Sequence, residues 1–440
     1  MKGEELLGGE PGEVILPGDD GYTEAATSDF LVGSPLAIAR PVTPAGVASV
    51  VLAAARTGRA LSVRSGGHTT WGTNEGGVVL DLSAIADVEV DGEVVRVGGG
   101  ARWGDVALAL AEHGLVMTSG DTASVGVGGI ALGGGIGWMV RAHGLTIDNL
   151  LGAELVTARG EVVRADPVTN PDLFWALRGG GGNFGVVTHF ELRARRLDGV
   201  VAGSFEFDPP QLVDAVKLWR DVMAGAPDEL TATFVSMPEL GPGMPAAVQI
   251  VAVWAGDDLD AARAATAPFA QHPGVRGGDL ARVSYRSLLD EDMEFEGAAP
   301  VMAVASDFLR VLEDDTVEEL ARIHAAYPGS MLMLRSLGGA FGRVAPDATA
   351  LAHRDAELLA LFVAFLPPGA APADVDAVHS TWRAATRTQS LGTYGNFRTD
   401  ESPTLLDEMY PPATLERLRA VKREWDPENV FRRNHNLAPA

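Results

Sequence analysis

The 440-residue chain contains no cysteine. Disulfides, thiolate metal sites and cysteine nucleophiles are therefore excluded, and we expect chemistry from other side chains and no metal centre. Basic residues are also scarce, because 34 Lys and Arg stand against 59 Asp and Glu, which gives a formal net charge of −25 at pH 7. Such a surface repels polyphosphates and anionic lipids, so we expect neither a nucleic-acid nor a membrane partner.

The chain also has no long hydrophobic run. Its longest apolar stretch, residues 358–367, is far shorter than the roughly 20 residues that cross a bilayer, and we expect a buried strand or helix there. Residues 1–20 are acidic and interrupted by Gly and Pro, without the basic-then-apolar pattern of a secretory signal, so the expected location is cytoplasmic. Aromatic residues make up only 6% of the chain, which argues mildly against a sugar-stacking platform.

The residues that are present predict a large globular α+β protein with more than one domain. The hydrophobic content is 46%, and short β-rich runs alternate with amphipathic helical patterns. Helices are expected at residues 43–58, 102–113, 171–177, 211–224 and 412–424, and strands at residues 60–63, 78–82, 88–90, 94–97, 153–157, 161–164, 184–193 and 248–254. Glycine density falls near residues 197–200, which indicates a domain boundary.

The most informative positive feature is glycine-rich backbone beside a single imidazole. Arg64-Ser65-Gly66-Gly67-His68 is followed by the glycine run of residues 125–137, and further clusters lie at residues 98–100 and 179–182. Amides in such loops can hold a pyrophosphate without cationic side chains, which suits an acidic protein. The run contains a Gly-x-Gly-x-x-Ala pattern, but the strand and acidic ribose ligand of a Rossmann site are missing, as is a Walker loop. Tight-turn packing is the alternative interpretation.

Ordered motifs along the chain match those of a known family. They are Arg64–His68, Leu80–Leu82, Val97–Gly100, Val125–Gly129 with Leu132–Gly135, Gly144–Asn149, Asp172–Val187, Val421–Asn429 and Phe431–Asn436. On these motifs, which span residues 41–193 and 394–437, the chain resembles the FAD-linked oxidases of the vanillyl-alcohol-oxidase superfamily, in their berberine-bridge-enzyme-like branch.

The resemblance implies a fold and a division of the chain. Residues 1–197 would form a PCMH-type FAD-binding domain of two αβ subdomains. Residues 198–390 would form an αβ substrate domain with an antiparallel sheet, and residues 391–440 would return to the FAD-binding domain.

The resemblance also implies that FAD is attached to His68 through its C8 methyl group. A neutral imidazole is a competent nucleophile near pH 7, and the neighbouring glycines remove Cβ atoms that would hold the ring away. Many relatives add a second bond from a cysteine at the position of Thr122, so a chain without cysteine is expected to use His68 only. The alternative is that His68 only satisfies its loop by hydrogen bonds. The expected cofactor-binding residues are His68, Arg64, Ser65, Gly66, Gly67, Thr69, Gly120, Asp121, Thr122, Val125, Gly126, Gly128, Gly129, Gly133, Gly134, Gly135, Gly137, Val187, Asn434 and Asn436.

For the reaction, the resemblance implies an oxidase that transfers a hydride from a C–H next to a hydroxyl or amine to flavin N5, with O2 as acceptor and H2O2 as product. Tyr394-Gly395-Asn396-Phe397 matches the family's Tyr-x-Asn-Tyr pattern except at Phe397. Tyr394 is the first candidate for a base, with Asn396 beside it, although its hydroxyl could instead close a sheet hydrogen bond. A neutral amine would need no base. His353 is a candidate substrate contact or a surface-loop residue.

Val125 occupies the place where the family's small residues leave oxygen a path to the flavin, and simple packing is the alternative. The expected partners are O2 and a small organic substrate, a secondary metabolite or alkaloid-like molecule, bound to a monomer or homodimer. Other classes remain open: a flavin dehydrogenase with another acceptor, a carbohydrate oxidase, a flavin-binding protein without turnover, and an NAD-dependent dehydrogenase.

Overall fold

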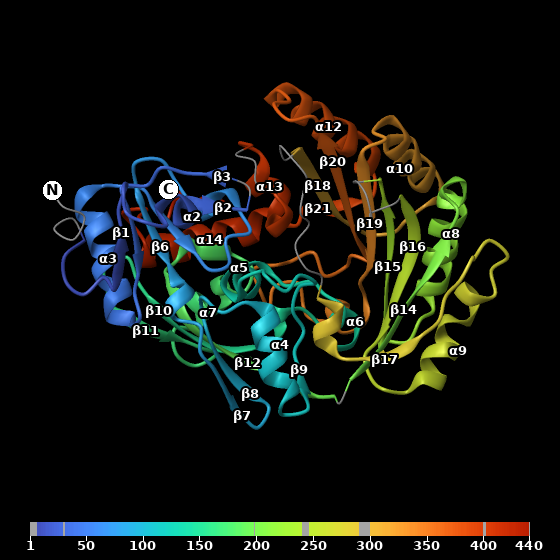
Figure 1. Ribbon diagram of the computed structural model, residues 1–440, viewed down its shortest axis with the longest axis horizontal. Helices are drawn as coiled ribbons and strands as arrows, with labels where there is room; N and C mark the ends of the chain where they lie inside the picture. The colour runs from blue at the N-terminus through green and yellow to red at the C-terminus, as the bar shows by residue number, and fades with distance from the viewer. Residues whose placement is uncertain are drawn as a thin grey trace.

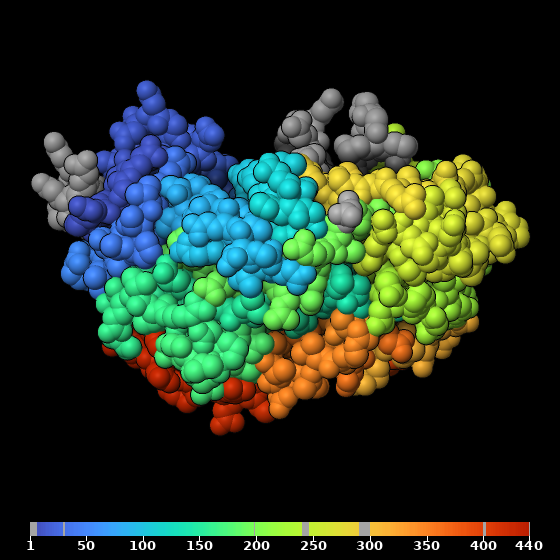
Figure 2. All heavy atoms as spheres, turned by 90° about the horizontal axis from the view of Figure 1, so that it is seen from below, coloured from blue at the N-terminus to red at the C-terminus, as the bar shows by residue number. Residues whose placement is uncertain are grey.

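The computed structural model describes residues 7–29, 31–197, 199–239, 246–289, 300–398 and 402–439. Figure 1 shows two parts side by side, with the N-terminal strands and the C-terminal helix α14 (Pro412–Trp425) in one part and a large sheet with outer helices in the other. Seen from below, the blue-to-green first part and the yellow-to-orange second part meet in a continuous contact (Figure 2). Residues 1–6, Asp198 and Ala440, at the ends of the expected segments, lie outside the described residues.

A four-stranded sheet forms the N-terminal end of the first part. Its order is β1 (Glu13–Ile15), β4 (Ala37–Arg40), β6 (Val78–Asp81) and β5 (Leu61–Arg64), with only β1 antiparallel to its neighbour. Helix α3 (Pro44–Thr57) follows the Thr43 cap, which accepts the Gly46 N–H, and ends at Gly58 with φ +64°. This is the Thr-Pro start and glycine stop that the sequence predicts.

A five-stranded antiparallel sheet completes the first part. Its order is β11 (Val162–Ala165), β10 (Leu150–Val156), β12 (Val186–Arg193), β8 (Val94–Gly98) and β7 (Val88–Asp91). Helices α4 (Trp103–Ala111) and α7 (Pro171–Leu177) bury Trp103 and Trp175 in the same hydrophobic core as this sheet.

The second part is built on an eight-stranded antiparallel sheet. Its order is β17 (Ala281–Val283), β14 (Val200–Phe207), β16 (Ala247–Trp254), β15 (Leu230–Met237), β19 (Ser330–Ser336), β20 (Leu358–Leu366), β18 (Val301–Leu309) and β21 (Ser390–Gly392). Helices α8 (Leu212–Ala224), α9 (Leu259–Ala270), α10 (Asp314–Ala326) and α12 (Pro372–Thr386) lie on its outer side (Figure 1). Trp219 and Trp382 from this layer pack with Phe234 and Phe362 of the sheet. Since strand residues alternate between faces, Arg335 on β19 points to the other face, toward the first part.

After β21 the chain returns to the first part through η7 (Gly395–Phe397), α13 (Leu405–Met409) and α14. Lys422 on α14 is fully buried, and its Nζ donates to Asp426 Oδ2 at 2.6 Å and to the carbonyls of Asn183 and Phe431, each at 2.9 Å. Because an unpaired buried ammonium would be very unfavourable, these acceptors fix the tail beside the 179–182 glycine cluster.

The remaining short elements connect these units. They are α2 (Tyr22–Ala26), β2 (Thr27–Ser28), β3 (Leu31–Val32), η1 (Thr70–Gly72), η2 (Leu82–Ala84), β9 (Leu115–Val116), α5 (Val127–Gly133), α6 (Val140–His143), η3 (Thr146–Asn149), η4 (Gly181–Asn183), β13 (Arg195–Arg196), η5 (Pro209–Gln211), η6 (Tyr285–Leu288) and α11 (Gly339–Arg343). Each helix and strand expected from the sequence is present, with ends shifted by a few residues. One expectation was wrong: the second glycine run is not a loop throughout, because α5 forms inside it. Val127, Ala131 and Leu132 of α5 are buried, and this packing outweighs the unfavourable helix propensity of glycine.

Candidate active site

Two glycine-rich segments meet at the end of β5. Ser65, directly after the strand, accepts the N–H of Gly128 at 3.1 Å. A Cβ atom at Gly66 would collide with the backbone of Gly126, and one at Gly126 would collide with Gly66 in turn. Glycine at both positions therefore permits an approach that a side chain would prevent, and this approach places His68 beside the second glycine run.

The imidazole of His68 lies at this junction with 23% of its side chain exposed. Its Nε2 is 2.7 Å from Ser124 Oγ and 3.2 Å from Asp29 Oδ2. Asp29 belongs to the β2–β3 connection, and its N–H donates to the Gly67 carbonyl at 3.2 Å. Two segments far apart in sequence thus hold the same imidazole nitrogen.

Arg64, expected to contact the cofactor, points to a different partner. Its buried guanidinium donates to Asp81 at 2.8 Å and to the carbonyls of Ala25 at 2.7 Å and Thr27 at 3.2 Å. Burial raises the pKa of Asp81, but the charge and hydrogen bond of Arg64, with further hydrogen bonds from Arg40 and the Ser83 backbone, outweigh it, so the pKa lies below its ordinary 3.8. These contacts give no support to a cofactor role for the Arg64 side chain; they anchor the segment that leads to Asp29.

The second glycine run has an open half and a filled half. No atom of the residues that the structure describes lies within 4 Å of the position that a Cβ atom would take at Gly129 on α5. At Gly133 the same atom would collide with the side chain of Asn396, and at Gly134 it would lie 2.8 Å from the ring of Tyr394. The open space beside Gly129 is therefore available to a ligand, whereas the C-terminal segment occupies the other half.

Tyr394 is 3% exposed and is built into this contact. Its hydroxyl oxygen accepts the Gly135 N–H at 2.9 Å and the Asn396 Nδ2–H at 3.0 Å. Burial raises the pKa of Tyr394 to about 12, although both hydrogen bonds act against this rise. These observations favour a structural phenol and do not favour a phenolate base; the role of Tyr394 as base stays a prediction.

The other candidate catalytic residues differ in their surroundings. Asn396 is exposed and donates to the Gly129 carbonyl at 3.4 Å, so it lies next to the open half of the glycine run. The Phe397 ring contacts Tyr394 edge-on with centroids 5.2 Å apart. His353 is 8% exposed, bonds the Met409 carbonyl at 2.9 Å, and has a pKa lowered by burial. The expectation of a surface-loop position for His353 was wrong, because the ring packs 5.5 Å from Phe308 in the core.

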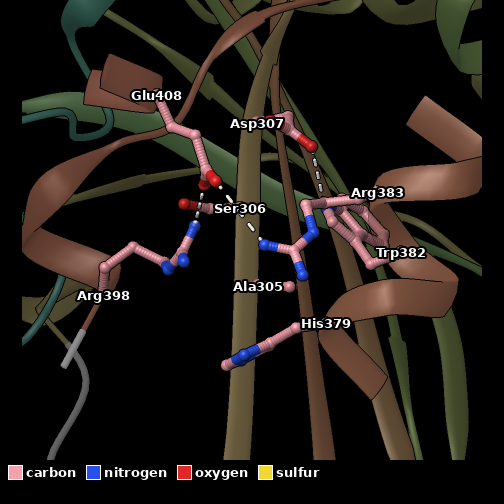
Figure 3. Close-up of a pocket in the computed structure, with 8 residues that line it drawn as sticks. All are labelled: Ala305, Ser306, Asp307, His379, Trp382, Arg383, Arg398 and Glu408. Carbon is pink, nitrogen blue, oxygen red and sulfur yellow. Dashed lines mark hydrogen bonds and ion pairs between the residues drawn. The ribbon is translucent and has the colours of Figure 1, made fainter. Parts of the chain in front are cut away.

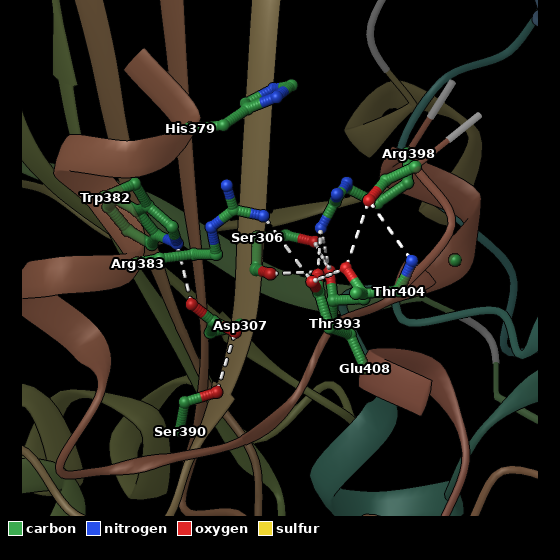
Figure 4. Close-up of polar contacts among 12 residues, drawn as sticks. Ser306, Asp307, His379, Trp382, Arg383, Ser390, Thr393, Arg398, Thr404 and Glu408 are labelled. Atoms are coloured by element: carbon green, nitrogen blue, oxygen red, sulfur yellow. Dashed lines mark hydrogen bonds and ion pairs between the residues drawn. The ribbon is translucent and has the colours of Figure 1, made fainter. Parts of the chain in front are cut away.

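A buried polar network fixes the strand pair that leads to Tyr394. The carboxylate of Asp307 on β18 accepts hydrogen bonds from Trp382, Thr386 and Ser390, each at 2.7 Å. Next to it, Arg398 pairs with Glu408 at 3.2 Å (Figures 3 and 4). The cavity among these groups has a volume of about 20 Å³, room for about one water molecule and not for a substrate. It is lined by Ala305, Ser306, Asp307, His379, Trp382, Arg383, Arg398 and Glu408.

The C-terminal tail presents acceptors for which the described part of the chain supplies no donor. Asn434 donates through Nδ2 to the Gly182 carbonyl at 3.1 Å, yet its buried Oδ1 has no hydrogen-bond partner among the described residues, and the same is true of Asn436 Oδ1. A Cβ atom at Gly182 would also meet no described atom within 4 Å. The flavin ring carries an N–H donor and a flat face, so unsatisfied amide oxygens beside side-chain-free backbone fit that group.

Other expected cofactor residues serve close backbone contacts. A Cβ atom at Gly137 would collide with the Ser119 carbonyl. A Cβ atom at Gly120 would lie only 2.6 Å from the Ile130 side chain. Gly67 and Gly135 have φ of +97° and +84°, which favour glycine.

The remaining expected positions lie around the same junction or in the core. Thr69 accepts the Trp71 N–H at the start of η1. Asp121 pairs with Arg335 of β19 at 2.8 Å, and Thr122 and Val125 are half-buried nearby in sequence. Val187, at 4% exposure, is part of the hydrophobic core.

Three residues at this junction were not expected from the sequence: Asp29, Ser124 and Arg335. The one sequence feature that could have indicated Ser124 is its position directly before the glycine run. Asp29 and Arg335 stand in segments without a motif, and only the fold brings them to His68 and Asp121.

Fold and site together define a two-part flavoprotein with an imidazole next to a glycine cradle. Residues 35–166 match the family model of the FAD binding domain, and residues 393–438 match that of berberine and berberine-like proteins. The (R)-6-hydroxynicotine oxidase of Paenarthrobacter nicotinovorans is 33% identical, with 97% of each chain covered. The solved 6-hydroxy-D-nicotine oxidase of Arthrobacter nicotinovorans has a TM-score of 0.82 at 31% identity and 98% coverage of each chain.

A solved chitooligosaccharide oxidase has a TM-score of 0.86 at 25% identity, with 97% of each chain covered. The chain belongs to the FAD-linked oxidases of the vanillyl-alcohol-oxidase superfamily, in their berberine-bridge-enzyme-like branch. It is an FAD-dependent oxidase, and the family and fold class expected from the motifs are confirmed. Among the helices of the described residues, none combines the length and apolarity needed to cross a membrane.

Proposed function

We propose that the protein holds FAD covalently through His68 alone and oxidises a small organic amine at a C–H next to nitrogen, with O2 as acceptor and H2O2 as product. When bound, the flavin supplies the electron-accepting chemistry at N5. The protein's own residues orient the donor carbon and exclude competing water. The proposal includes residues 1–197 and 391–440 as the cofactor-binding unit and residues 198–390 as the substrate unit.

The tether proposal rests on the contact between Gly66 and Gly126 and on the position of His68, whose Nε2 lies 2.7 Å from Ser124 Oγ, directly before the second glycine run. A second tether would need a thiol, and the chain has no cysteine; Thr122 stands where many relatives have one. The solved glucooligosaccharide oxidase of Acremonium strictum carries a 6-S-cysteinyl, 8α-N1-histidyl FAD. A single linkage would therefore distinguish this chain from that protein.

The preference for an amine rests on the absence of a fitting base among the expected candidates. Tyr394 is buried with a pKa of about 12, Phe397 has no hydroxyl, and His353 is buried against Met409. An alcohol needs a group that removes its proton as the hydride leaves, whereas a neutral amine already carries the lone pair that stabilises the developing cation. The nicotine-oxidising relative supports the same choice by analogy.

The sheet face opposite the outer helices supports an apolar substrate. Its half-buried residues alternate with core residues and include Val235, Met302, Val304 and Met333. A carbohydrate is the second candidate because of the chitooligosaccharide oxidase likeness. The half-buried side chains named above are aliphatic, and Phe365, opposite Met302, adds an aromatic ring to this face, so it offers little of the aromatic surface on which sugars stack.

The decisive first experiment is the visible spectrum of acid-precipitated protein. The pellet should stay yellow in the wild type and become colourless in His68→Ala, because only a covalent flavin survives denaturation. Anaerobic mixing with cyclic amines, secondary alcohols or oligosaccharides then identifies the substrate class by bleaching of the flavin, and a peroxide assay in air tests the acceptor. A wild-type pellet without flavin would overturn the tether, and bleaching by oligosaccharides but not by amines would overturn the amine assignment.

A further inference from the structure

We infer that Asp29 is the positioning residue that prepares His68 for covalent attachment of the flavin, an inference that rests on the proposed tether. The observation behind it is the contact of Asp29 Oδ2 with His68 Nε2 at 3.2 Å. The surrounding structure fixes this contact from two sides. The Asp29 N–H bonds the Gly67 carbonyl, and the buried Arg64 holds the carbonyls of Ala25 and Thr27 just before it.

A carboxylate at Nε2 selects one tautomer of the imidazole. Asp29 can only accept a hydrogen bond, so it favours the form with a proton on Nε2 and a lone pair on Nδ1. Ser124, 2.7 Å from the same nitrogen, can share that proton as a second acceptor or donate to an unprotonated Nε2, so it selects neither form. The charge of Asp29 is therefore the feature that directs reactivity to Nδ1.

Asp29 also stabilises the charge that forms during attachment. When Nδ1 bonds to the 8-methyl carbon, the ring becomes cationic, and a carboxylate at Nε2 favours that cation, as in other Asp-His pairs. Over the whole reaction one methyl C–H bond and the Nε2–H bond break and one Nδ1–C bond forms. Two electrons and two protons pass to O2, which becomes H2O2. Asp29 accepts the Nε2 proton before solvent carries it away.

The test follows covalent incorporation over time after FAD is added to protein produced without flavin, read as flavin fluorescence that survives denaturing gel electrophoresis. Asp29→Asn keeps size and hydrogen-bonding capacity but removes the charge. We expect incorporation to slow about tenfold or more, the effect of losing a charge-assisted hydrogen bond. Reversible FAD binding, measured before incorporation, should change little, because 46% of the Asp29 side chain is exposed and the cradle is made of backbone.

Two further variants make the outcome specific. Asp20→Asn removes an exposed carboxylate from the same N-terminal segment and should incorporate FAD at the wild-type rate. Ser124→Ala removes a second contact of Nε2 without changing charge and should slow incorporation less than Asp29→Asn. A wild-type rate in Asp29→Asn, or a larger effect in Ser124→Ala, would overturn the role of Asp29 while leaving the tether intact. No incorporation in the wild type would instead overturn the proposed tether itself.

Discussion

Tyr394 illustrates how a residue expected to do chemistry can serve packing. Its hydroxyl accepts two hydrogen bonds, one of them from the backbone of the glycine run that it covers. Tyr394→Phe leaves the Gly135 N–H without its partner, so we expect the free energy of unfolding to fall by about 1–3 kcal/mol. Denaturant unfolding measures this loss.

The same variant separates structure from catalysis. If Tyr394 is not the base, kcat should fall by less than about tenfold, and the wild-type rate should show no rise from phenol ionisation between neutral pH and the region of its pKa, about 12. Burial raises the pKa because it disfavours the phenolate, so the phenol of Tyr394 stays neutral across this pH range. A loss of about 10²- to 10⁴-fold, the size of a general-base contribution, would show that the hydroxyl takes part in the reaction.

Val125 is the residue at which the acceptor can be tested. Its side chain is half-buried, packs against the core of the first part, and precedes Gly126. Val125→Leu should lower the oxygen-dependent rate by about tenfold while dye-dependent turnover stays near the wild-type value, because a larger side chain narrows the path for O2 but not for electron transfer to a dye. Parallel oxygen-electrode and dye-reduction assays give the two rates. Equal effects on the oxygen-dependent and the dye-dependent rates would show that Val125 serves packing and does not control access of O2.

At the level of single residues, the sequence predicted positions better than partners. The motifs placed His68, Gly66 and Gly126 in one site, and the contact between the two glycines agrees with that placement. They could not predict Asp29, because its contact with His68 depends on a hairpin that Arg64 anchors through backbone carbonyls. Backbone acceptors leave no pattern in side-chain identities.

Among the elements, α5 gives a direct test of the cofactor cradle. The space beside Gly129 is open, so Gly129→Leu can be accommodated by the protein alone and should also suit a helix better than glycine does. We expect FAD affinity to fall by about tenfold or more, because the new side chain occupies the ligand's space, while the thermal stability of the flavin-free protein is kept or raised.

The matched control is Gly225→Leu at the end of α8, where a Cβ atom also meets no atom of the described ranges within 4 Å. Titration of flavin-free protein with FAD compares the two variants. An unchanged affinity of Gly129→Leu for FAD would show that this half of the glycine run is not part of the binding site.

Elements with strong end signals were predictable and α5 was not. Helix α3 has a Thr-Pro start and a glycine stop, and the structure reproduces both. In α5 the local preference of the glycines opposes a helix, and burial of Val127, Ala131 and Leu132 decides the conformation. Tertiary packing of this kind is not visible in a local pattern.

For the whole molecule, an ion pair between Arg335 and Asp121 helps to join the two parts. Arg335 of the large sheet is 2% exposed; it bonds Asp121 at 2.8 Å and lies 4.6 Å from the Trp138 ring. Arg335→Met should lower the free energy of unfolding by about 2–4 kcal/mol, because it leaves a partly buried carboxylate without its cation. Arg263→Met, which breaks an exposed pair with Asp279, should change it by less than about 1 kcal/mol. Similar values for both variants would show that this contact contributes little to joining the parts.

The division into a motif-rich unit and a central sheet follows from the sequence, but the contacts between them do not. The motifs that carry the family resemblance lie within residues 41–193 and 394–437, whereas Arg335 and Asp307 lie outside them. In this chain, close backbone contacts such as that between Gly66 and Gly126 shape the glycine-rich site, whereas side chains outside these motifs shape the face of the large sheet. The substrate of the protein is therefore the feature that the sequence defines least.

The path of the chain also sets the order in which the cradle is assembled during synthesis. Glycine-rich backbone near residues 66 and 126 emerges from the ribosome early, but Tyr394, Asn434 and Asn436 emerge only after the whole eight-stranded sheet. A nascent chain therefore holds half a cradle with unfilled backbone surfaces for most of its translation. We therefore expect the coenzyme to be taken up by the finished polypeptide and not by the growing one.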